Sequence, residues 1–196
     1  MSGCATDTYI LVDAPQYLTV ELDKVKNYIG VPLEDTSQDQ LITCMIYSAQ
    51  CLFESFTRTE LTEKTFDLKI NCWRNCITIY KSPLISIESV KYIDENSDEQ
   101  TVDNTEYYVT PYQPYSVLNF DPSFDSPQVL SRALQITIQF KAGKTTEADP
   151  LADECIQQGL MANVAYLYEN RECGCDESFI PAQSKGLYSS CKIVSI

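Results

Sequence analysis

The spacing of apolar residues changes twice along this chain, and that change constrains the fold most. Apolar residues recur at helical spacing in the first third, alternate from residue 65 to residue 140, and return to helical spacing from residue 150. The clearest alternation places Leu134, Ile136, Ile138 and Phe140 between polar neighbours, which is typical of a strand with one buried and one wet face. A β-module that leads into a closing helix predicts an α+β fold in which a helical core carries a β insertion.

Two helices are predicted before the β region. The first covers about residues 20 to 29, with Thr19 as its N-cap and Gly30 in its C-terminal turn. The second covers about residues 37 to 57, and Ser37 with Gln40 forms a capping box at its start. Apolar residues spread over more than one face of this second helix, so we expect it to be sandwiched between other elements.

A third helix is predicted over residues 150 to 171. Asp149 suits the N-cap, and Pro150 suits the first helical position because a proline there loses no hydrogen bond. Beyond Glu172 the chain is polar and non-periodic, and Gly174, Pro181 and Gly186 argue against a packed helix. We expect an extended C-terminal arm that is mobile in the isolated chain and orders on a partner.

Short strands and turns fill the middle of the chain. A skipped residue between the Ile85–Ile87 and Val90–Tyr92 alternations predicts a β-bulge, and the acidic stretch 94–98 predicts a turn. The other strand candidates are 66–70, 77–79, 107–109 and 117–120. The predicted organisation is therefore an irregular lead without periodicity (1–17), a first helical part (18–64), an antiparallel β-subdomain (65–143), a second helical part (144–172) and an arm (173–196).

The net charge of −14, from 14 basic and 28 acidic residues, argues against binding to nucleic acid. It suits a surface that DNA must slide past without sticking. No segment has the ~18 continuous apolar residues of a membrane span. The first residues resemble neither a secretory signal nor a myristoylation site, so we expect synthesis in a cytoplasm, with use there or assembly there into something larger.

The cysteines do not resemble a disulfide framework, since their number is odd and their spacing is irregular. A zinc site built from Cys72, Cys76, Cys173 and Cys175 is conceivable, but the spacings fit zinc knuckles poorly and the chain has no histidine. Reduced thiols are the favoured interpretation, and no metal or other cofactor is predicted.

Catalysis finds little support in the sequence. Histidine, the commonest general base, is absent, and the carboxylates of Asp94, Glu95, Asp98 and Glu99 fit a solvated turn. The stretch 142–145 ends like a phosphate-binding loop but lacks the required first glycine, so it is interpreted as a turn leaving a strand. Trp73 fits an exposed recognition residue, a hairpin tip or a partly buried anchor. The protein is not predicted to be an enzyme.

Four stretches of the chain together resemble the head–tail connector, or adaptor, proteins of tailed bacteriophages. They are residues 41–61, the proline-led 81–94 with its Pro-Leu-Ile-Ser-Ile-Glu-Ser-Val-Lys-Tyr, 134–143, and 166–172 with its Tyr-Glu-Asn-Arg-Glu. The second helix usually ends in Thr-Gly-Arg in that family, whereas this chain has Phe56-Thr57-Arg58 and lacks the turn glycine. The lead and the tail lie outside the resemblance.

The resemblance implies a virion protein of the neck, assembled in the host cytoplasm. In that family a ring, typically twelvefold, joins the portal to tail or neck proteins and lets DNA pass without specific binding. The family's C-terminal segment contacts the portal, which makes candidates of the apolar tail residues Phe179, Ile180, Leu187, Tyr188, Ile193, Val194 and Ile196. Candidates for subunit contacts or helix-end ion pairs are Tyr168, Glu169, Arg171 and Glu172.

Two other functions remain open on the sequence alone. The tyrosine-rich β region suits an acidic binding module, on a virion or a cell surface, that engages a carbohydrate or protein receptor. The cysteines suit a metal-supported protein. The connector is the leading hypothesis.

Overall fold

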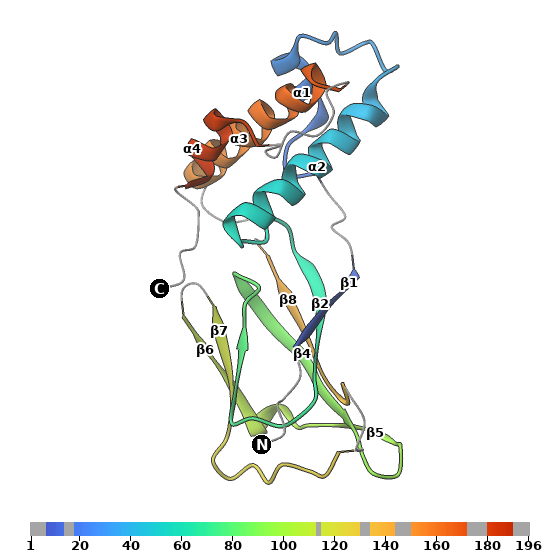
Figure 1. Cartoon of the computed structure of the whole chain (residues 1–196), viewed down its shortest axis with the longest axis vertical. Coiled ribbons are helices and arrows are strands. Elements are labelled where there is room, and N and C mark those ends of the chain that lie inside the picture. The colour runs from blue at the N-terminus through green and yellow to red at the C-terminus, as the bar shows by residue number, and fades with distance from the viewer. Residues whose placement is uncertain are drawn as a thin grey trace. The chain divides into compact units, whose positions relative to one another are not determined.

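The computed structural model describes residues 7–13, 18–112, 115–129, 134–143, 150–171 and 180–189. It divides into two compact units. The β unit comprises Met1–Pro15 and Glu63–Lys144, and the helical unit comprises Gln16–Thr62 and Thr145–Ile196. Helices and antiparallel strands thus occur in separate units, which confirms the predicted α+β class (Figure 1).

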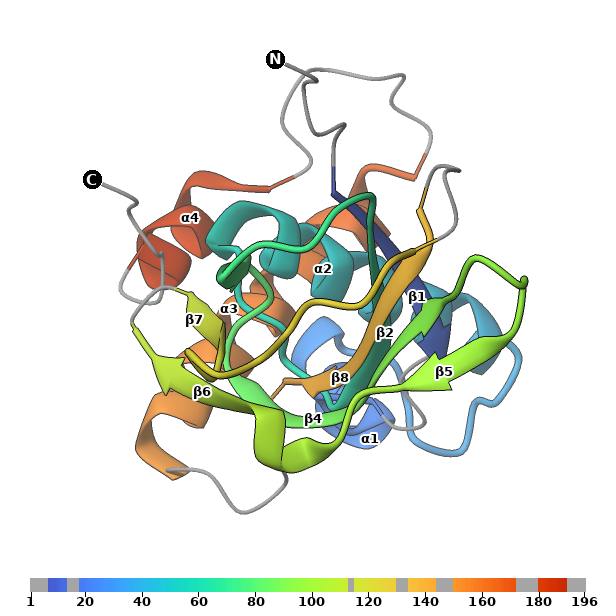
Figure 2. The ribbon, with the colours of Figure 1, turned by 90° about the horizontal axis from the view of Figure 1, so that it is seen from below.

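The β unit contains two antiparallel sheets. The first has the order β1 (Thr8–Asp13), β2 (Lys64–Ile70), β8 (Ile136–Ala142), β4 (Leu84–Ile93) and β5 (Glu99–Thr101). The second has the order β3 (Cys76–Ile79), β7 (Ser116–Phe120) and β6 (Tyr107–Pro111), and a 3-10 turn at Asn104–Glu106 precedes β6. Figure 2 shows β2, β8 and β4 side by side in the larger sheet.

β8 is the central strand of the larger sheet, and its alternation organises the core. Ile136, Ile138 and Phe140 are fully buried, while the residues between them are half-buried on the other face. Ile138 lies opposite Leu68 of β2 and Val90 of β4, and both of these are buried as well. The predicted half-buried strand is confirmed, although it starts at Ile136 because Leu134 has a φ of 60° and lies in a turn.

β4 carries the predicted bulge. Its register against β8 shifts between Ile87 and Ser89, so an extra β4 residue interrupts the ladder there. The shift accounts for the broken alternation in the sequence, since Val90 still reaches the core after the extra residue.

The lead that was expected to be irregular contains a strand. β1 pairs with β2 along Thr8 to Asp13 and forms one edge of the larger sheet, so the expectation for these residues is wrong. Only Tyr9 of this strand is half-buried, and Ile10, Leu11 and Val12 are all exposed, so the strand has no alternating pattern to detect.

The helical unit is built from four helices, α1 (Leu22–Ile29), α2 (Asp39–Thr57), α3 (Pro150–Glu169) and α4 (Ala182–Ser189). α1, α2 and α3 pack on one another as predicted, and they share a core with α4. The fully buried members of this core include Val25, Ile42, Ile46, Phe53 and Leu160. Within the described residues, none of these helices has the length and apolar character needed to cross a bilayer.

The helix starts were predicted less well than the helix ends. Thr19 does not cap α1, whose N-cap position is Glu21, because the Thr19 hydroxyl donates instead to Oε1 of Gln50, at 2.8 Å. The expected capping box is also absent, since the Ser37 hydroxyl donates to Asp35 and Gln38 occupies the N-cap position of α2. Asp149 lies outside the described residues.

α1 and α2 each end at a residue with a left-handed backbone conformation. Gly30 ends α1 with a φ of 77°, as the sequence predicted. Arg58 ends α2 with a φ of 62° and donates its backbone N–H to the Glu54 carbonyl. A left-handed conformation is thus present at this turn although glycine is absent.

Replacing Arg58 by glycine should therefore stabilise the helical unit. Glycine adopts a positive φ without steric cost, so we expect a gain of about 0.5–1 kcal/mol in the free energy of unfolding. Urea denaturation followed by circular dichroism at 222 nm measures it. Ser55→Gly, inside the same helix on an exposed position, is the control and should lose about 0.5–1 kcal/mol. Equal losses in both variants would contradict the prediction.

Candidate interaction surfaces

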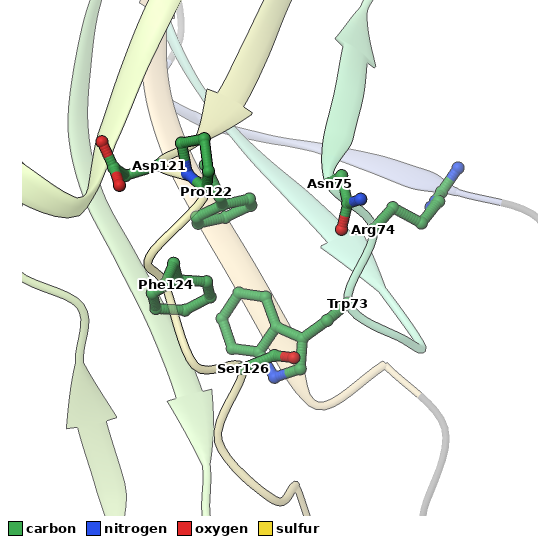
Figure 3. Close-up of a pocket in the computed structure, with 8 residues that line it drawn as sticks. Trp73, Arg74, Asn75, Asp121, Pro122, Phe124 and Ser126 are labelled. Carbon is green, nitrogen blue, oxygen red and sulfur yellow. The ribbon is translucent and has the colours of Figure 1, made fainter.

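Trp73 is a partly buried anchor of the β unit, which settles the three sequence interpretations. Its indole N–H donates to the Pro127 carbonyl at 2.9 Å, and its ring packs edge-on against Phe120 and Phe124, each 5.4 Å away. A pocket of about 240 Å³ lies beside it, and Figure 3 shows Phe124 next to the indole with Arg74 directed away. Arg74 forms an ion pair with Asp7. The three packed rings thus form one part of the pocket lining, and the rest comes from Arg74, Asn75, Asp121, Pro122 and Ser126.

The acidic stretch after β4 is a turn, as predicted. The Asp94 carboxylate accepts backbone N–H groups from Asn96 and Asp98, at 2.9 Å and 3.0 Å. The hydrogen bond from Asp98 is the main cause that lowers the pKa of Asp94. A carboxylate stabilised in its charged form by its own turn is poorly suited to general acid catalysis at neutral pH.

The stretch that ends like a phosphate-binding loop is the exit from β8. Ala142 is the last residue of the strand and is fully buried. Gly143 follows with a φ of 131°, and its N–H donates to the Pro83 carbonyl at 2.8 Å. This N–H is therefore already engaged in a backbone hydrogen bond of the β unit. Lys144 and Thr145 lie outside the described residues.

The cysteines correct one expectation. Cys72 is disulfide-bonded, so it is not a reduced thiol, and it cannot serve as a thiolate ligand of the conceivable zinc site. Four others, Cys44, Cys51, Cys76 and Cys155, are free and exposed. Cys173 and Cys175 lie outside the described residues, and the described part of the chain holds no cluster of three or more metal-ligating side chains.

The helix-end candidates lie at the end of α3. The Tyr168 hydroxyl donates to Oε1 of Gln38 at 2.8 Å, a contact within the helical unit. The Arg171 guanidinium lies 4.5 Å from the centre of the Tyr168 ring, a cation–π geometry. Glu169 is exposed, and Glu172 lies outside the described residues. The structure thus gives Tyr168 an intrachain role.

The expectation that no packed helix follows Glu172 is wrong for residues 182–189, which form α4. Of the candidate portal contacts, Tyr188 is fully buried, while Ile180 and Leu187 are half-buried. The Tyr188 ring packs edge-on against Phe53 of α2 at 4.7 Å, and burial raises the pKa of Tyr188 to about 12. Phe179, Ile193, Val194 and Ile196 lie outside the described residues.

α4 packs closely against α3, and a glycine of α3 makes this close approach possible. The Ser184 hydroxyl of α4 donates to the Gly159 carbonyl of α3 at 3.0 Å. A Cβ added at Gly159 would lie 2.6 Å from Cε1 of Tyr188, whereas one at Gly186 would meet nothing within 4 Å. A missing side chain at Gly159 therefore allows α4 to dock, and this requirement has no local sequence signal.

Replacing Gly159 by alanine should displace α4. The added methyl overlaps a buried ring, and overpacking of this kind costs about 1–3 kcal/mol. Hydrogen exchange of residues 182–189 should accelerate, which mass spectrometry of peptides from this segment measures. Gly186→Ala is the matched control, and it should leave exchange equal or slower because alanine favours the helix. Unchanged exchange in Gly159→Ala would show that α4 does not depend on this contact.

One side of α2 is exposed, so the prediction of a sandwiched helix is wrong. Its other side is buried at Ile42, Ile46, Ala49 and Phe53. We use the name neutral α2 face for the exposed, uncharged residues Leu41, Cys44, Tyr47, Ser48 and Cys51. Leu41 is 40% and Tyr47 37% exposed. The second apolar stripe in the sequence is thus a surface of the isolated chain.

The β unit exposes uncharged side chains on two of its strands. β1 carries Ile10, Leu11 and Val12, and it forms an edge of the larger sheet. β6 carries Tyr108 and Val109, and it forms an edge of the smaller sheet. Edge strands with apolar side chains can pair with another chain, so both are candidate contact surfaces.

Comparison with known proteins identifies the fold. No family model and no curated protein matches the chain. The solved structures that it resembles include a chain in "Neck of empty GTA particle computed with C6 symmetry", at a TM-score of 0.78 and 16% identity, covering 96% of this chain and 97% of that one. Similar matches occur in "Virion of native gene transfer agent (GTA) particle" (TM-score 0.75, 18% identity, 96% of each chain) and "Neck of native GTA particle computed with C12 symmetry" (0.70, 16%, 96% and 97%). The chain therefore shares, over almost its whole length, the fold of chains in these particles.

Proposed function

We propose that this chain is a structural, non-catalytic subunit of a virion neck, and that its copies form a ring that joins the portal to the tail and continues the DNA channel. The observation that carries the proposal is the fold match over 96% of this chain and 97% of a chain in a particle neck. Two of the matched necks were computed with sixfold and twelvefold symmetry, which supports a ring of identical subunits. These matches also support the resemblance to head–tail connectors found in the sequence.

The charge of the chain fits a conduit for DNA. With a net charge of −14, a ring of many copies repels the phosphate backbone, so DNA passes without being held. We therefore infer that the channel surface is net negative. Tight binding of duplex DNA at physiological salt, measured by fluorescence anisotropy, would contradict this part of the proposal.

We infer that portal binding belongs to the C-terminal segment that contains α4. Tyr188 anchors this helix in the helical core, so deleting α4 would expose that core and confuse folding with binding. Deleting residues 190–196 removes Ile193, Val194 and Ile196 and leaves α4 in place. We expect the truncated chain to fold and to bind the portal more weakly. Full-strength binding would assign these residues to another role.

Size-exclusion chromatography with light scattering, with and without a purified portal ring, tests the main proposal. We expect a ring-sized oligomer, or a stoichiometric complex of several copies on the portal. A chain that stays monomeric and does not bind the portal would reject the connector function.

The exposed tyrosines of the β unit support a second candidate function, a binding module for a carbohydrate or protein receptor. The rings of Tyr112 and Tyr115 stack at 5.6 Å, Tyr80 lies 6.3 Å from Tyr115, and Tyr80 and Tyr112 are exposed. Aromatic rings of this kind can stack on sugars. Glycan-array binding that is lost in Tyr112→Ala, by a monomeric chain, would favour this function over the connector.

A further inference from the structure

We propose that the neutral α2 face is the surface through which one copy of this chain binds the next copy. The proposal rests on the ring function above and names a contact inside that ring. Leu41, Cys44, Ser48 and Cys51 follow one another at spacings of three or four residues, and Tyr47 lies three residues after Cys44, so all five lie along one side of α2. All five are exposed in the isolated chain.

The absence of charge on this surface points to an identical partner. No charged residue occurs between Asp39 and Glu54, in a chain whose overall content of Asp, Glu, Lys and Arg is 21%. Two copies that each carry a net charge of −14 repel one another, and a contact surface without acidic groups keeps this repulsion smallest. A basic partner would instead be attracted to the acidic surfaces, and it would gain nothing electrostatic from this helix face.

The face also has the shape of a contact site. Tyr47, Ser48, Cys51 and Leu52 of α2, together with Leu167 of α3, line an open groove of about 540 Å³. α2 and α3 pack together within the helical unit, so both walls of the groove are held by one core. An apolar side chain of a neighbouring copy that entered this groove would be removed from water, which favours association.

The buried side of α2 makes the contact surface preformed. Ile42, Ile46, Ala49 and Phe53 are fully buried and fix the rotation of the helix about its axis. The exposed stripe on the opposite side therefore cannot turn into the core of its own unit. Binding a second copy covers it without rearranging the helix, and a preformed surface loses little entropy on binding.

The protein's own thiols provide the first test. Cys44 and Cys51 lie on the neutral α2 face, while Cys76 and Cys155 are free and exposed elsewhere. Assembled rings and the unassembled chain are treated with N-ethylmaleimide, and mass spectrometry measures the rate of modification at each cysteine. We expect modification of Cys44 and Cys51 to slow by about tenfold or more on assembly, since the centre of an interface excludes solvent. Protection of these two that is no greater than that of Cys76 and Cys155 overturns the proposal.

Charged substitutions provide the second test. Tyr47→Asp and Cys51→Asp place a carboxylate on the face, and Cys155→Asp places one on an exposed position of α3 as the matched control. We expect the two α2 variants to remain folded, by circular dichroism, but to lose ring assembly in light scattering, whereas Cys155→Asp assembles like the unmodified chain. Normal assembly of both α2 variants overturns the proposal.

The two proposals fail in distinguishable ways. If the unmodified chain forms rings in which Cys44 and Cys51 react freely, the ring function stands and only the assignment to α2 falls. If the unmodified chain forms no ring, alone or on a portal, the proposed function falls and the α2 contact falls with it.

Discussion

Replacing Ile138 by aspartate should unfold the β unit. Ile138 is fully buried at the centre of β8, between Leu68 of β2 and Val90 of β4. A carboxylate there loses its hydration and finds no partner among these apolar neighbours, which places the substitution in the most destabilising class. We expect a loss of about 4 kcal/mol or more in the free energy of unfolding.

Trp73 makes the effect measurable within the β unit. It is the only tryptophan of the chain, and its ring packs against Tyr92 of β4 and Phe120 of β7. Urea denaturation followed by tryptophan fluorescence therefore reports on this unit. The variant should show an unfolded-like emission spectrum or a strongly lowered urea midpoint.

Thr137→Asp is the matched control, one residue away on the opposite face of β8. Thr137 is half-buried, and its cross-strand neighbours are Lys69 of β2 and Lys91 of β4. The attraction between a carboxylate and two lysines offsets the lower strand propensity of aspartate, so we expect stability to change by only about 1 kcal/mol or less. Similar losses in both variants would show that the sheet does not bury one face of β8.

Replacing Lys26 by methionine should strongly destabilise the helical unit. Lys26 is 1% exposed, and its ammonium group holds the connection between α1 and α2. It donates to the Leu33 carbonyl at 2.9 Å, to the Asp35 carbonyl at 2.7 Å and to Oδ1 of Asp39 at 2.8 Å. Methionine keeps the apolar stem but leaves these acceptors without their donor. We expect a loss of about 2–3 kcal/mol, because Asp39 stays partly hydrated and water compensates in part.

Urea denaturation followed by circular dichroism at 222 nm measures this loss, with Lys24→Met as the control. Lys24 is 51% exposed and lies 3.8 Å from the Glu21 carboxylate, a surface pair whose removal should cost about 0.5 kcal/mol or less. The backbone amides of residues 31 to 38 should also exchange faster in Lys26→Met alone. Equal effects of the two substitutions would show that Lys26 contributes only a surface charge.

Local periodicity determined most of the elements from the sequence alone. The alternation through Phe66, Leu68 and Ile70 predicted β2, and the skipped residue before Val90 predicted the bulge in β4. Helical spacing placed α2 and α3 within about two residues of their observed bounds. Each of these elements buries one face. An element that buries one face needs apolar residues at regular spacing, and this spacing can be detected in the sequence.

Tertiary structure decided the elements and roles whose partners lie far away in the sequence. β1 forms because its backbone can hydrogen-bond to the free edge of β2. Its exposed side chains show no periodic spacing in the sequence. α4 docks because Gly159 leaves room for Tyr188, and Lys26 is buried because three oxygens converge on its ammonium. The second apolar stripe of α2 was predicted to be buried in the chain's own core. A sequence shows that a helix face is apolar, but it does not show what covers that face. These features depend on groups brought together only by folding, so local pattern and propensity could not reveal them.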